Sequence, residues 1–355
     1  MSNNESADSR RDFLRSLAVA LTGAALTPAL PSAAAEEPMI LGQGSYRYRV
    51  LRNWGVLDRQ TPVKDCHGMV QSRDGRIFLL TNHTANNVII YNAEGRLLGK
   101  WGTQWPGAHG LTLFTEDGEE RLFITDHDRH EVYKTTLDGV ILMTLGWPEG
   151  IPPYRRTEQY KPTHVAVNGD GTFYVADGYG LNYILHYDPR GRLIRVFGGD
   201  DDSPAALKCA HGLHVDRRDP SRPELLITSR SQSAIKRFSP AGEYLGSISL
   251  AGAMPCFIVP WGEHLVVPHL KGATRPTGSD TENGFVSILD RQNRIVANLA
   301  AGAPVYEGQR LQPMSANTTV FRYPHGLLVD REENLYVAQW NSGQTYPIKL
   351  ERLKG

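Results

Sequence analysis

The chain has 355 residues, and its 38 basic side chains balance its 38 acidic ones. No segment concentrates lysine and arginine, which argues against nucleic acid or an anionic membrane surface as a partner. The three cysteines, Cys66, Cys209 and Cys256, allow at most one intramolecular disulfide and exclude a small disulfide-rich scaffold.

The first 35 residues have the features of an export signal. The pair Arg10–Arg11 precedes a Phe-Leu pair, a moderately apolar stretch and the small residues Ala33–Ala35. This order is typical of a twin-arginine signal peptide over 1–35, cleaved before Glu36. An ordinary secretory signal and an N-terminal anchor are the alternatives. The twin-arginine interpretation predicts recognition by that export machinery, a periplasmic or secreted location, and no stable membrane insertion after cleavage.

Residues 36–355 repeat one pattern of four short strands. Residues 163–198 read as strand, turn, strand, loop, strand, turn and strand, with Gly-Asp-Gly and Pro-Arg-Gly at the turns. Five further copies follow the same pattern, and the last has three strands: 67–102, 109–146, 211–249, 256–299 and 325–353. Four-stranded units of roughly 40–50 residues are typical of a β-propeller.

The two ends of this region supply complementary parts of one repeat. Residues 46–55 resemble the fourth strand of the other copies, whereas 325–353 lack a fourth strand. Pairing the two segments would close the ring and protect an otherwise open sheet edge. The sequence therefore predicts an all-β fold, a single six-bladed propeller domain over 36–355, in preference to a solenoid. The insertion at 271–284 is predicted to be a surface loop.

Five of the six copies begin with a histidine at an equivalent position. The first strand of each propeller blade lines the central channel, so these positions are predicted to form a ring at one mouth. The ring consists of His67, His109, His164, His211, Cys256 and His325. Converging neutral imidazoles suit Zn²⁺ or a similar divalent transition metal. The alternative is that each histidine only forms a hydrogen bond at the start of its strand.

A second set of equivalent positions follows the second strand of each copy. It contains His83, His127, Tyr179, Arg230, His269 and Trp340, in loops predicted to lie at the same mouth. Together the two sets hold eight of the twelve histidines in the chain. This concentration predicts a polar, titratable rim around the metal ring.

The segment "VAVNGDGTFYVADGYGLNYI" at 165–184 and the "HGL" starts of the second, fourth and sixth copies resemble NHL-type six-bladed propellers. Within that group the chain resembles the peptidyl-hydroxyglycine α-amidating lyase domain, over nearly all of 36–355. The resemblance implies that His109, His211 and His325, from alternate blades, bind zinc. It also implies that Tyr179 acts as a base and that Arg230 binds a substrate carboxylate, for which a guanidinium is well suited.

The chain departs from the family at several positions. A second key arginine of the family is replaced by a loop with Asn82 and His83, and a methionine before the last ligand is Tyr323. An aspartate after that ligand is Gly326, which removes one side-chain contact to the structural calcium ion that the resemblance implies. The substrate therefore remains open, and a sugar or uronic acid also fits.

Two of the ring histidines, His67 and His164, are extra relative to the family's pattern. Three roles are open to them: binding a second metal ion, supporting the first ion from outside its ligand shell, or changing the ligand set.

These features favour an exported, metal-dependent lyase that cleaves a C–N or C–O bond by elimination. The substrate would be a small molecule or oligomer bearing a carboxylate or hydroxyls. The metal would polarise a substrate oxygen, Tyr179 or a ring histidine would move the proton, and Arg230 would hold the carboxylate. The rim residues His83, His127 and His269 would contact the substrate. The alternatives are a metal-dependent hydrolase such as a lactonase, and a non-catalytic binding propeller.

Overall fold

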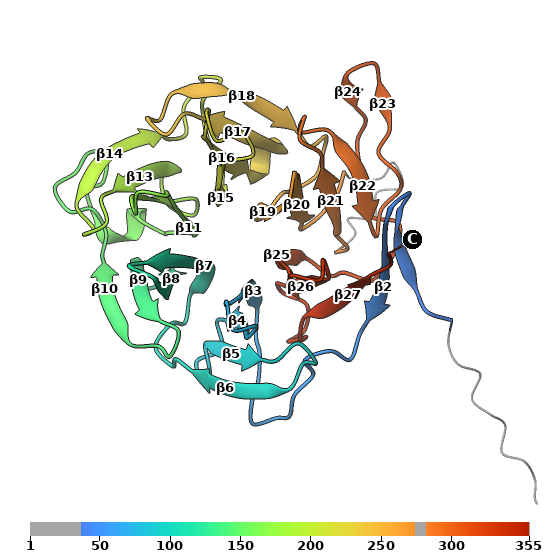
Figure 1. The fold of residues 1–355 in the computed structure, drawn as a ribbon. Coiled ribbons are helices and arrows are strands. Elements are labelled where there is room, and N and C mark those ends of the chain that lie inside the picture. The colour runs from blue at the N-terminus through green and yellow to red at the C-terminus, as the bar shows by residue number, and fades with distance from the viewer. Residues whose placement is uncertain (1–36, 274–281, 355) are drawn as a thin grey trace, which may run out of the picture. The chain divides into compact units, whose positions relative to one another are not determined.

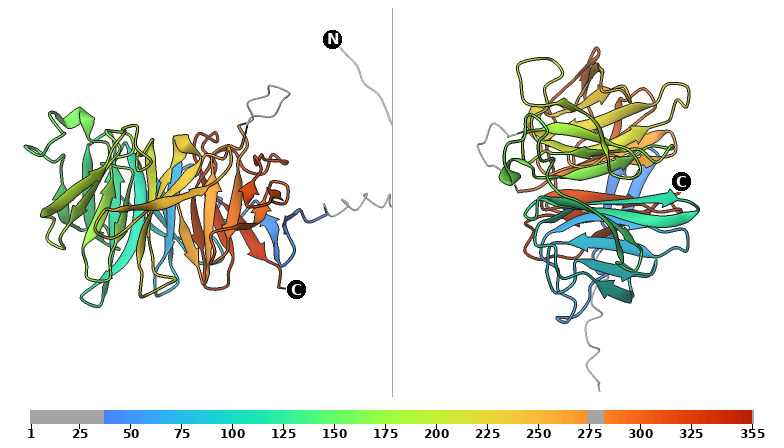
Figure 2. Two further views of the ribbon diagram at one scale, coloured as in Figure 1. Left: turned by 90° about the horizontal axis from the view of Figure 1, so that it is seen from above. Right: turned by 90° about the vertical axis from the view of Figure 1, so that its left-hand side faces the viewer.

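Six antiparallel sheets surround a central axis (Figure 1). The structure is a computed structural model, and it describes residues 37–273 and 282–354. In five sheets the four strands follow one another along the chain, from the innermost to the outermost. The predicted six-bladed propeller is thus confirmed, and Figure 2 shows its strands running between the two faces of the ring.

Blades one to three contain twelve strands, with the 3₁₀ turn η1 (Thr157–Gln159) between blades two and three. The strands are β3 (Cys66–Gln71), β4 (Ile77–Thr81), β5 (Val88–Tyr91), β6 (Leu97–Trp101), β7 (Ala108–Glu116), β8 (Glu119–Asp126), β9 (Glu131–Thr136), β10 (Ile141–Leu145), β11 (His164–Val167), β12 (Phe173–Ala176), β13 (Tyr183–Tyr187) and β14 (Leu193–Gly198).

Blades four and five contain eight strands, with the 3₁₀ turn η2 (Arg230–Gln232) inside blade four. The strands are β15 (Ala210–Asp216), β16 (Glu224–Ser229), β17 (Ala234–Phe238), β18 (Tyr244–Ser249), β19 (Val259–Trp261), β20 (His264–His269), β21 (Phe285–Leu289) and β22 (Ile295–Leu299). A small hairpin of β23 (Tyr306–Glu307) and β24 (Arg310–Leu311) follows blade five.

The sixth blade combines strands from both ends of the described chain. Its innermost strands are β25 (Pro324–Val329), β26 (Leu335–Gln339) and β27 (Ile348–Arg352). Strand β2 (Tyr46–Leu51) pairs antiparallel with β27, and β1 (Ile40–Gln43) pairs with β2 as a fifth strand. The sequence did not predict β1, which also contacts blade five through a hydrogen bond from the Gln43 amide to the carbonyl of Ala301.

Short runs rich in β-branched and aromatic residues form the strands, and glycines end the hairpin turns between them. Gly171 and Gly191 close the two turns of blade three with φ values of +82° and +80°, which residues with a side chain rarely adopt. The apolar core lies between neighbouring sheets. Between blades one and two, for example, Phe78 and Trp105 are completely buried, and each such side chain contributes roughly 1.5–3 kcal/mol.

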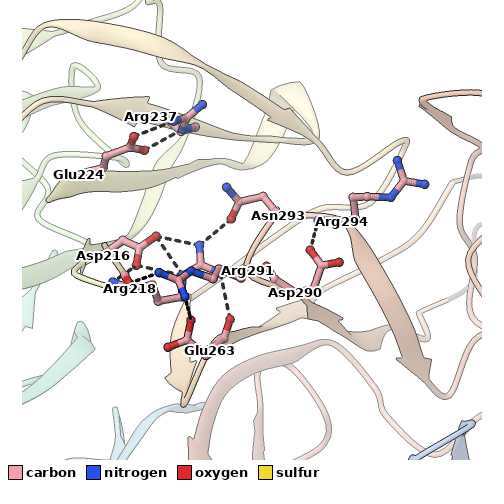
Figure 3. A network of polar contacts seen from close by, with 9 residues as sticks. All are labelled: Asp216, Arg218, Glu224, Arg237, Glu263, Asp290, Arg291, Asn293 and Arg294. Atoms are coloured by element: carbon pink, nitrogen blue, oxygen red, sulfur yellow. Dashed lines mark hydrogen bonds and ion pairs between the residues drawn. The ribbon is translucent and has the colours of Figure 1, made fainter. Parts of the chain in front are cut away.

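A polar network joins the hairpin turns of blades four and five (Figure 3). The buried Arg218 guanidinium pairs with Asp216 at 2.7 Å and also donates to the Asp290 carbonyl at 2.9 Å and the Asn293 side chain at 2.6 Å. These turns lie at the opposite ends of the strands from the ring positions. The network therefore connects adjacent blades away from the histidine cluster described below.

Two predicted segments lie outside the described residues: the signal peptide over 1–35 and, within the predicted loop, residues 274–281. The domain boundary at residue 36 stays a prediction. Within the described part of the chain, no helix has the length and apolar character needed to cross a membrane.

Candidate metal centre

The His-Gly pair that recurs at the start of the blades disrupts the regular register of the innermost strand. The pairing of β3 with β4, β7 with β8, β15 with β16, and β25 with β26 shifts at this pair. Such a β-bulge turns a side chain away from the direction that regular pairing would give it. In blades two, four and six the bulge accompanies a histidine whose ring meets the other two at one end of the channel.

The glycine of each pair allows the next blade to approach closely. In blade one, a Cβ atom added to Gly68 would lie 2.9 Å from Leu111 Cβ. In blades two, four and six, an added Cβ would lie far inside van der Waals distance of a backbone carbonyl oxygen in the neighbouring innermost segment. The distances are 2.6 Å from Gly110 to Thr163, 2.3 Å from Gly212 to Cys256 and 2.1 Å from Gly326 to His67. Glycine is therefore required here by the packing of one blade on the next.

The same three carbonyls face the Nδ1 atoms of the ring histidines. His109 Nδ1 donates to the Thr163 carbonyl at 2.7 Å, and His325 Nδ1 donates to the His67 carbonyl at 3.1 Å. The His211 ring faces the Cys256 carbonyl without completing a full hydrogen bond. With the proton on Nδ1, each Nε2 presents a lone pair, which is the usual arrangement of metal-binding histidines.

The Nε2 atoms of the three histidines converge. His211 Nε2 lies 3.0 Å from His109 Nε2 and 3.1 Å from His325 Nε2. Zinc–nitrogen bonds of about 2.0–2.1 Å in a tetrahedral arrangement place their nitrogens roughly 3.3–3.4 Å apart. Converging lone pairs at this spacing repel one another unless a cation lies between them, so the donors and their spacing fit a divalent metal ion.

Burial keeps these imidazoles neutral. It lowers the pKa of His109, His211 and His325 well below the ordinary value, and positive charge on neighbouring groups lowers it further. For His211 the largest of these neighbours is the Arg230 guanidinium. A neutral imidazole is the form that binds a metal ion.

Tyr179 and Arg230 lie directly against this cluster. The Tyr179 hydroxyl is 3.1 Å from Nε2 of both His109 and His211, and it accepts a hydrogen bond from Arg230 Nη1 at 3.2 Å. Burial raises the pKa of Tyr179 above its ordinary value, and the nearby Arg230 guanidinium opposes part of this rise. Arg230 begins the 3₁₀ turn η2, and its Nη2 also donates to the Cys256 thiol at 3.4 Å. Two loops thus place Tyr179 and Arg230, the residues predicted to transfer a proton and to bind a carboxylate, beside the histidines.

A cavity of about 420 Å³ opens beside the cluster. Its walls combine cationic, aromatic and aliphatic side chains: Tyr179, Arg230, Met254, Leu270, Lys271, Tyr323, His325 and Trp340. Met254, Leu270 and Lys271 were not among the predicted site residues. Leu270 follows β20 as Arg230 follows β16 and Trp340 follows β26, so the prediction for blade five fell one residue too early, on His269. The cavity can hold a small anionic molecule that also carries an apolar group.

The Phe257 ring packs against the histidines of the centre. It lies 5.2 Å from the ring of His325 and 5.4 Å from that of His211, between centroids. It also lines a second cavity of about 430 Å³, which includes His164. Phe257 was not among the predicted site residues, although it occupies the position where four other copies have the glycine of the His-Gly pair.

The structure corrects the prediction that His164 belongs to the ring at this mouth. Its strand pairs in regular register, with His164 opposite Ala176, and the following residue is Val165 instead of glycine. Without a bulge the side chain takes another direction. The His164 ring stacks on Phe257 at 4.4 Å, and its Nδ1 accepts a hydrogen bond from the Leu213 amide at 3.1 Å.

The other ring members, His67 and Cys256, lie at the cluster. The His67 ring is 4.8 Å from His109 and 4.7 Å from His325, between centroids. The Cys256 sulfur lies within 4.8 Å of ligand atoms of His211 and His325. All three cysteines are free thiols in the structure.

The three histidines predicted to form the rim differ in their positions and contacts. His127 lies near the cluster, with its ring 5.5 Å from Tyr179 and its Nδ1 2.9 Å from the Asp128 carboxylate. His83 is half-buried and accepts a hydrogen bond from the Ala85 amide within its own loop, away from the cluster. His269 is completely buried inside blade five, where it bonds the Ser287 hydroxyl at 2.8 Å, so its predicted place on the rim is wrong.

No protein-family model matches the chain. The chain is 37% identical over 110 residues to peptidyl-α-hydroxyglycine α-amidating lyase 1 of Drosophila melanogaster, covering 30% of this chain and 19% of that protein. It is 32% identical over 132 residues to the probable α-amidating lyase pgal-1 of Caenorhabditis elegans, covering 36% of this chain and 37% of that protein. The similarity to amidating lyases is therefore confirmed, and it spans about a fifth to two fifths of these relatives' lengths.

Among solved structures, a gluconolactonase from Xanthomonas campestris superimposes with a TM-score of 0.60 at 13% identity. The match covers 92% of this chain and 97% of the gluconolactonase. At this identity the likeness concerns the fold, which hosts different reactions in different proteins.

Proposed function

We propose that this chain is a metal-dependent lyase that cleaves a C–N or C–O bond by elimination at the histidine cluster. One observation carries the proposal: the Nε2 atoms of His109, His211 and His325 converge, and the Tyr179 hydroxyl lies 3.1 Å from two of them. The sequence similarity to α-amidating lyases supports this reaction class and makes a peptidyl-α-hydroxyglycine the first substrate to test.

A divalent transition metal, with zinc as the first candidate, would be held by Nε2 of His109, His211 and His325. When bound, it would supply a Lewis acid that polarises a substrate oxygen. Among the described residues, the candidate ligands grouped here are imidazoles and one thiol. Such donors favour zinc and similar metals, whereas calcium and magnesium prefer oxygen ligands. The structural calcium ion implied by the resemblance stays a prediction.

Arg230 would position the substrate. Its guanidinium is fixed by contacts to the Tyr179 hydroxyl and the Cys256 thiol, and it lines the cavity beside the cluster. The pKa of Arg230 is raised, because the effects of Tyr179 and Cys256 exceed the opposing effect of burial. A permanently charged, immobilised guanidinium would bind a carboxylate and direct the adjacent carbon toward the histidines.

The Tyr179 hydroxyl would move the proton. In an α-hydroxyglycine, Tyr179 Oη would accept the substrate hydroxyl proton as it passes its own phenol proton to the leaving nitrogen, while the C–O bond becomes a carbonyl and the C–N bond breaks. The electron pair of that bond goes to nitrogen, which takes up a proton, so the products are an amide and an aldehyde acid. Tyr179 lines the cavity that would hold the substrate, so its hydroxyl would be within reach of both the substrate hydroxyl and the leaving nitrogen.

Export by the twin-arginine route belongs to the same proposal. That route carries folded proteins, often after they have acquired their metal, which would allow the cluster to be loaded before export. The test is the N-terminal sequence of the protein recovered from the periplasm, with Glu36 expected as the first residue. Retention of the N-terminal segment would overturn this part alone.

The central experiment combines elemental analysis with an activity assay. The purified protein should contain a transition metal, and His109→Ala, His211→Ala and His325→Ala should each lose it. We expect the wild type to release an amide from a peptidyl-α-hydroxyglycine, and the three variants to lose at least about 100-fold in kcat/KM, since even groups outside the ligand shell contribute 10–100-fold.

The outcomes separate the candidate functions. Metal binding with hydrolysis of lactones and no elimination would replace the lyase by a hydrolase that uses the same cluster. A wild type that contains no metal, and takes up none from solutions of divalent ions, would contradict both enzymes and leave the binding propeller.

A further inference from the structure

We propose that His67 is a fourth ligand of the ion held by His109, His211 and His325, so that the centre contains four imidazoles. The inference rests on the proposed metal site. It goes beyond it by adding a residue of this chain to the three ligands that the family resemblance implies.

The His67 ring is buried and lacks partners. Only 2% of the residue is exposed, and neither Nδ1 nor Nε2 has a hydrogen-bond partner among the described residues. Buried polar atoms in folded proteins are nearly always paired, because leaving them unpaired forfeits their hydration without replacement. A missing partner at the His67 ring is therefore an observation that requires an explanation.

The ring points at the cluster. Its centroid lies 4.8 Å from His109 and 4.7 Å from His325, and a His67 nitrogen lies within 4.8 Å of ligand nitrogens of both. His109 and His325 thus form the shared edge of two triangles, with His211 completing one and His67 the other. An ion near the shared edge would lie beside the His67 ring and would satisfy one of its orphaned nitrogens.

The other extra histidine shows what a purely structural role looks like. His164 occupies the equivalent position in blade three, and both of its nitrogens face polar groups: Leu213 N–H at 3.1 Å and the Thr112 hydroxyl at 3.5 Å. His164 therefore provides a matched control for the loss of a buried imidazole from an innermost strand.

Cys256 is the competing ligand. Its sulfur groups with His211 and His325, but it already accepts a hydrogen bond from Arg230 at 3.4 Å and donates one to the Pro324 carbonyl at 3.7 Å. Binding the ion would remove the thiol proton from the Pro324 carbonyl, whereas His67 has no partner to lose. The geometry favours His67.

Four neutral ligands have two consequences for the centre. They leave the charge of a divalent ion uncompensated, which favours anionic substrates beside Arg230. They also require more than four coordination positions if a substrate is to bind, since a tetrahedral ion with four protein ligands is closed.

Cobalt provides the test, because its visible absorption reports both coordination number and ligand type. The wild type, His67→Leu, His67→Asn and His164→Leu would be stripped with a chelator and titrated with Co²⁺. We expect the two His67 variants to bind Co²⁺ at least about 10-fold more weakly and to show stronger absorption bands, as four-coordinate cobalt does. His164→Leu should reproduce the wild-type spectrum and affinity.

Thermal unfolding separates loss of a ligand from general damage. Without metal, His67→Leu should unfold at a temperature equal to or above that of the wild type, because two unpaired polar atoms are removed. With Co²⁺, the rise in Tm should be smaller for His67→Leu than for the wild type. If leucine at position 67 disturbs folding, His67→Asn provides a second variant that also lacks the imidazole.

Two results would overturn the inference while leaving the three-histidine centre intact. One is unchanged cobalt affinity and spectrum in both His67 variants. The other is a thiolate-to-cobalt charge-transfer band that persists in them and disappears in Cys256→Ser. A wild type that binds no metal at all would overturn the proposed function together with this inference.

Discussion

Blades two and three both begin with a histidine at an equivalent position and use it differently. In blade two His109 precedes Gly110, the strand bulges, and the ring joins the cluster. In blade three His164 precedes Val165, the strand is regular, and the ring stacks on Phe257 and lines the second cavity. The difference teaches that the residue after the histidine, through its effect on register, decides where the imidazole points.

The largest expected effect comes from adding one carbon at a His-Gly pair. In Gly212→Ala the new Cβ would lie 2.3 Å from the Cys256 carbonyl oxygen and 2.8 Å from Phe257 Cα, both in the neighbouring blade's innermost segment. We expect a loss of at least about 3 kcal/mol in the free energy of unfolding and weaker metal binding, measured by denaturant unfolding and metal titration.

The control is Gly146→Ala, because no atom lies within 4 Å of a Cβ added there. Its free energy of unfolding should stay close to that of the wild type. If Gly212→Ala were equally mild, the close approach between blades four and five would not be needed for the cluster, and the comparison between blades would lose its basis.

A second prediction concerns the loop that blade three does contribute to the centre. Tyr179→Phe removes the hydroxyl that lies 3.1 Å from His109 and His211 and keeps the ring. We expect kcat to fall by about 100-fold or more, as for loss of a general acid–base group, while metal content stays unchanged. Tyr323→Phe, in the same cavity, is the control and should retain kcat. Equal kcat values for the two variants would exclude Tyr179 as the proton carrier.

Much of this arrangement could be predicted from the sequence because repetition fixes the backbone. Turn residues at regular spacing give the blades, and equivalent positions in the blades converge on one axis. For this reason Tyr179 and Arg230, selected by resemblance, were expected at the same mouth as His109, where the structure places them.

Repetition does not fix the direction of a side chain within its blade. A one-residue change of register reverses the face that a strand residue presents, which is why His164, in a strand without a bulge, was misplaced. His269 was misplaced because it ends β20, one residue before the rim position of blade five, which Leu270 occupies. Two cavity residues of blade five, Met254 and Leu270, occupy repeat positions that correspond to Tyr323 and Trp340 of blade six, so a residue-by-residue alignment of the copies could have assigned them.

The smallest expected effect is a pH dependence that comes from His164. Burial lowers its pKa to about 4, below the ordinary histidine value of 6.5. Between these two values the unfolded chain binds a proton that the folded protein does not, so the free energy of unfolding decreases as the pH falls below 6.5. The slope is up to about 1.4 kcal/mol per pH unit. The contribution of neutral, buried His164 to the free energy of unfolding is therefore present at pH 7 and largely lost near pH 4.

His164→Leu removes this proton uptake. Between pH 7 and pH 5 the metal-free wild type should lose about 2 kcal/mol more unfolding free energy than the metal-free variant, as measured by denaturant unfolding at each pH. Parallel pH profiles for wild type and His164→Leu would mean that the folded protein protonates His164 without cost. The ring could then not be the tightly stacked, fully partnered group that separates blade three from blade two.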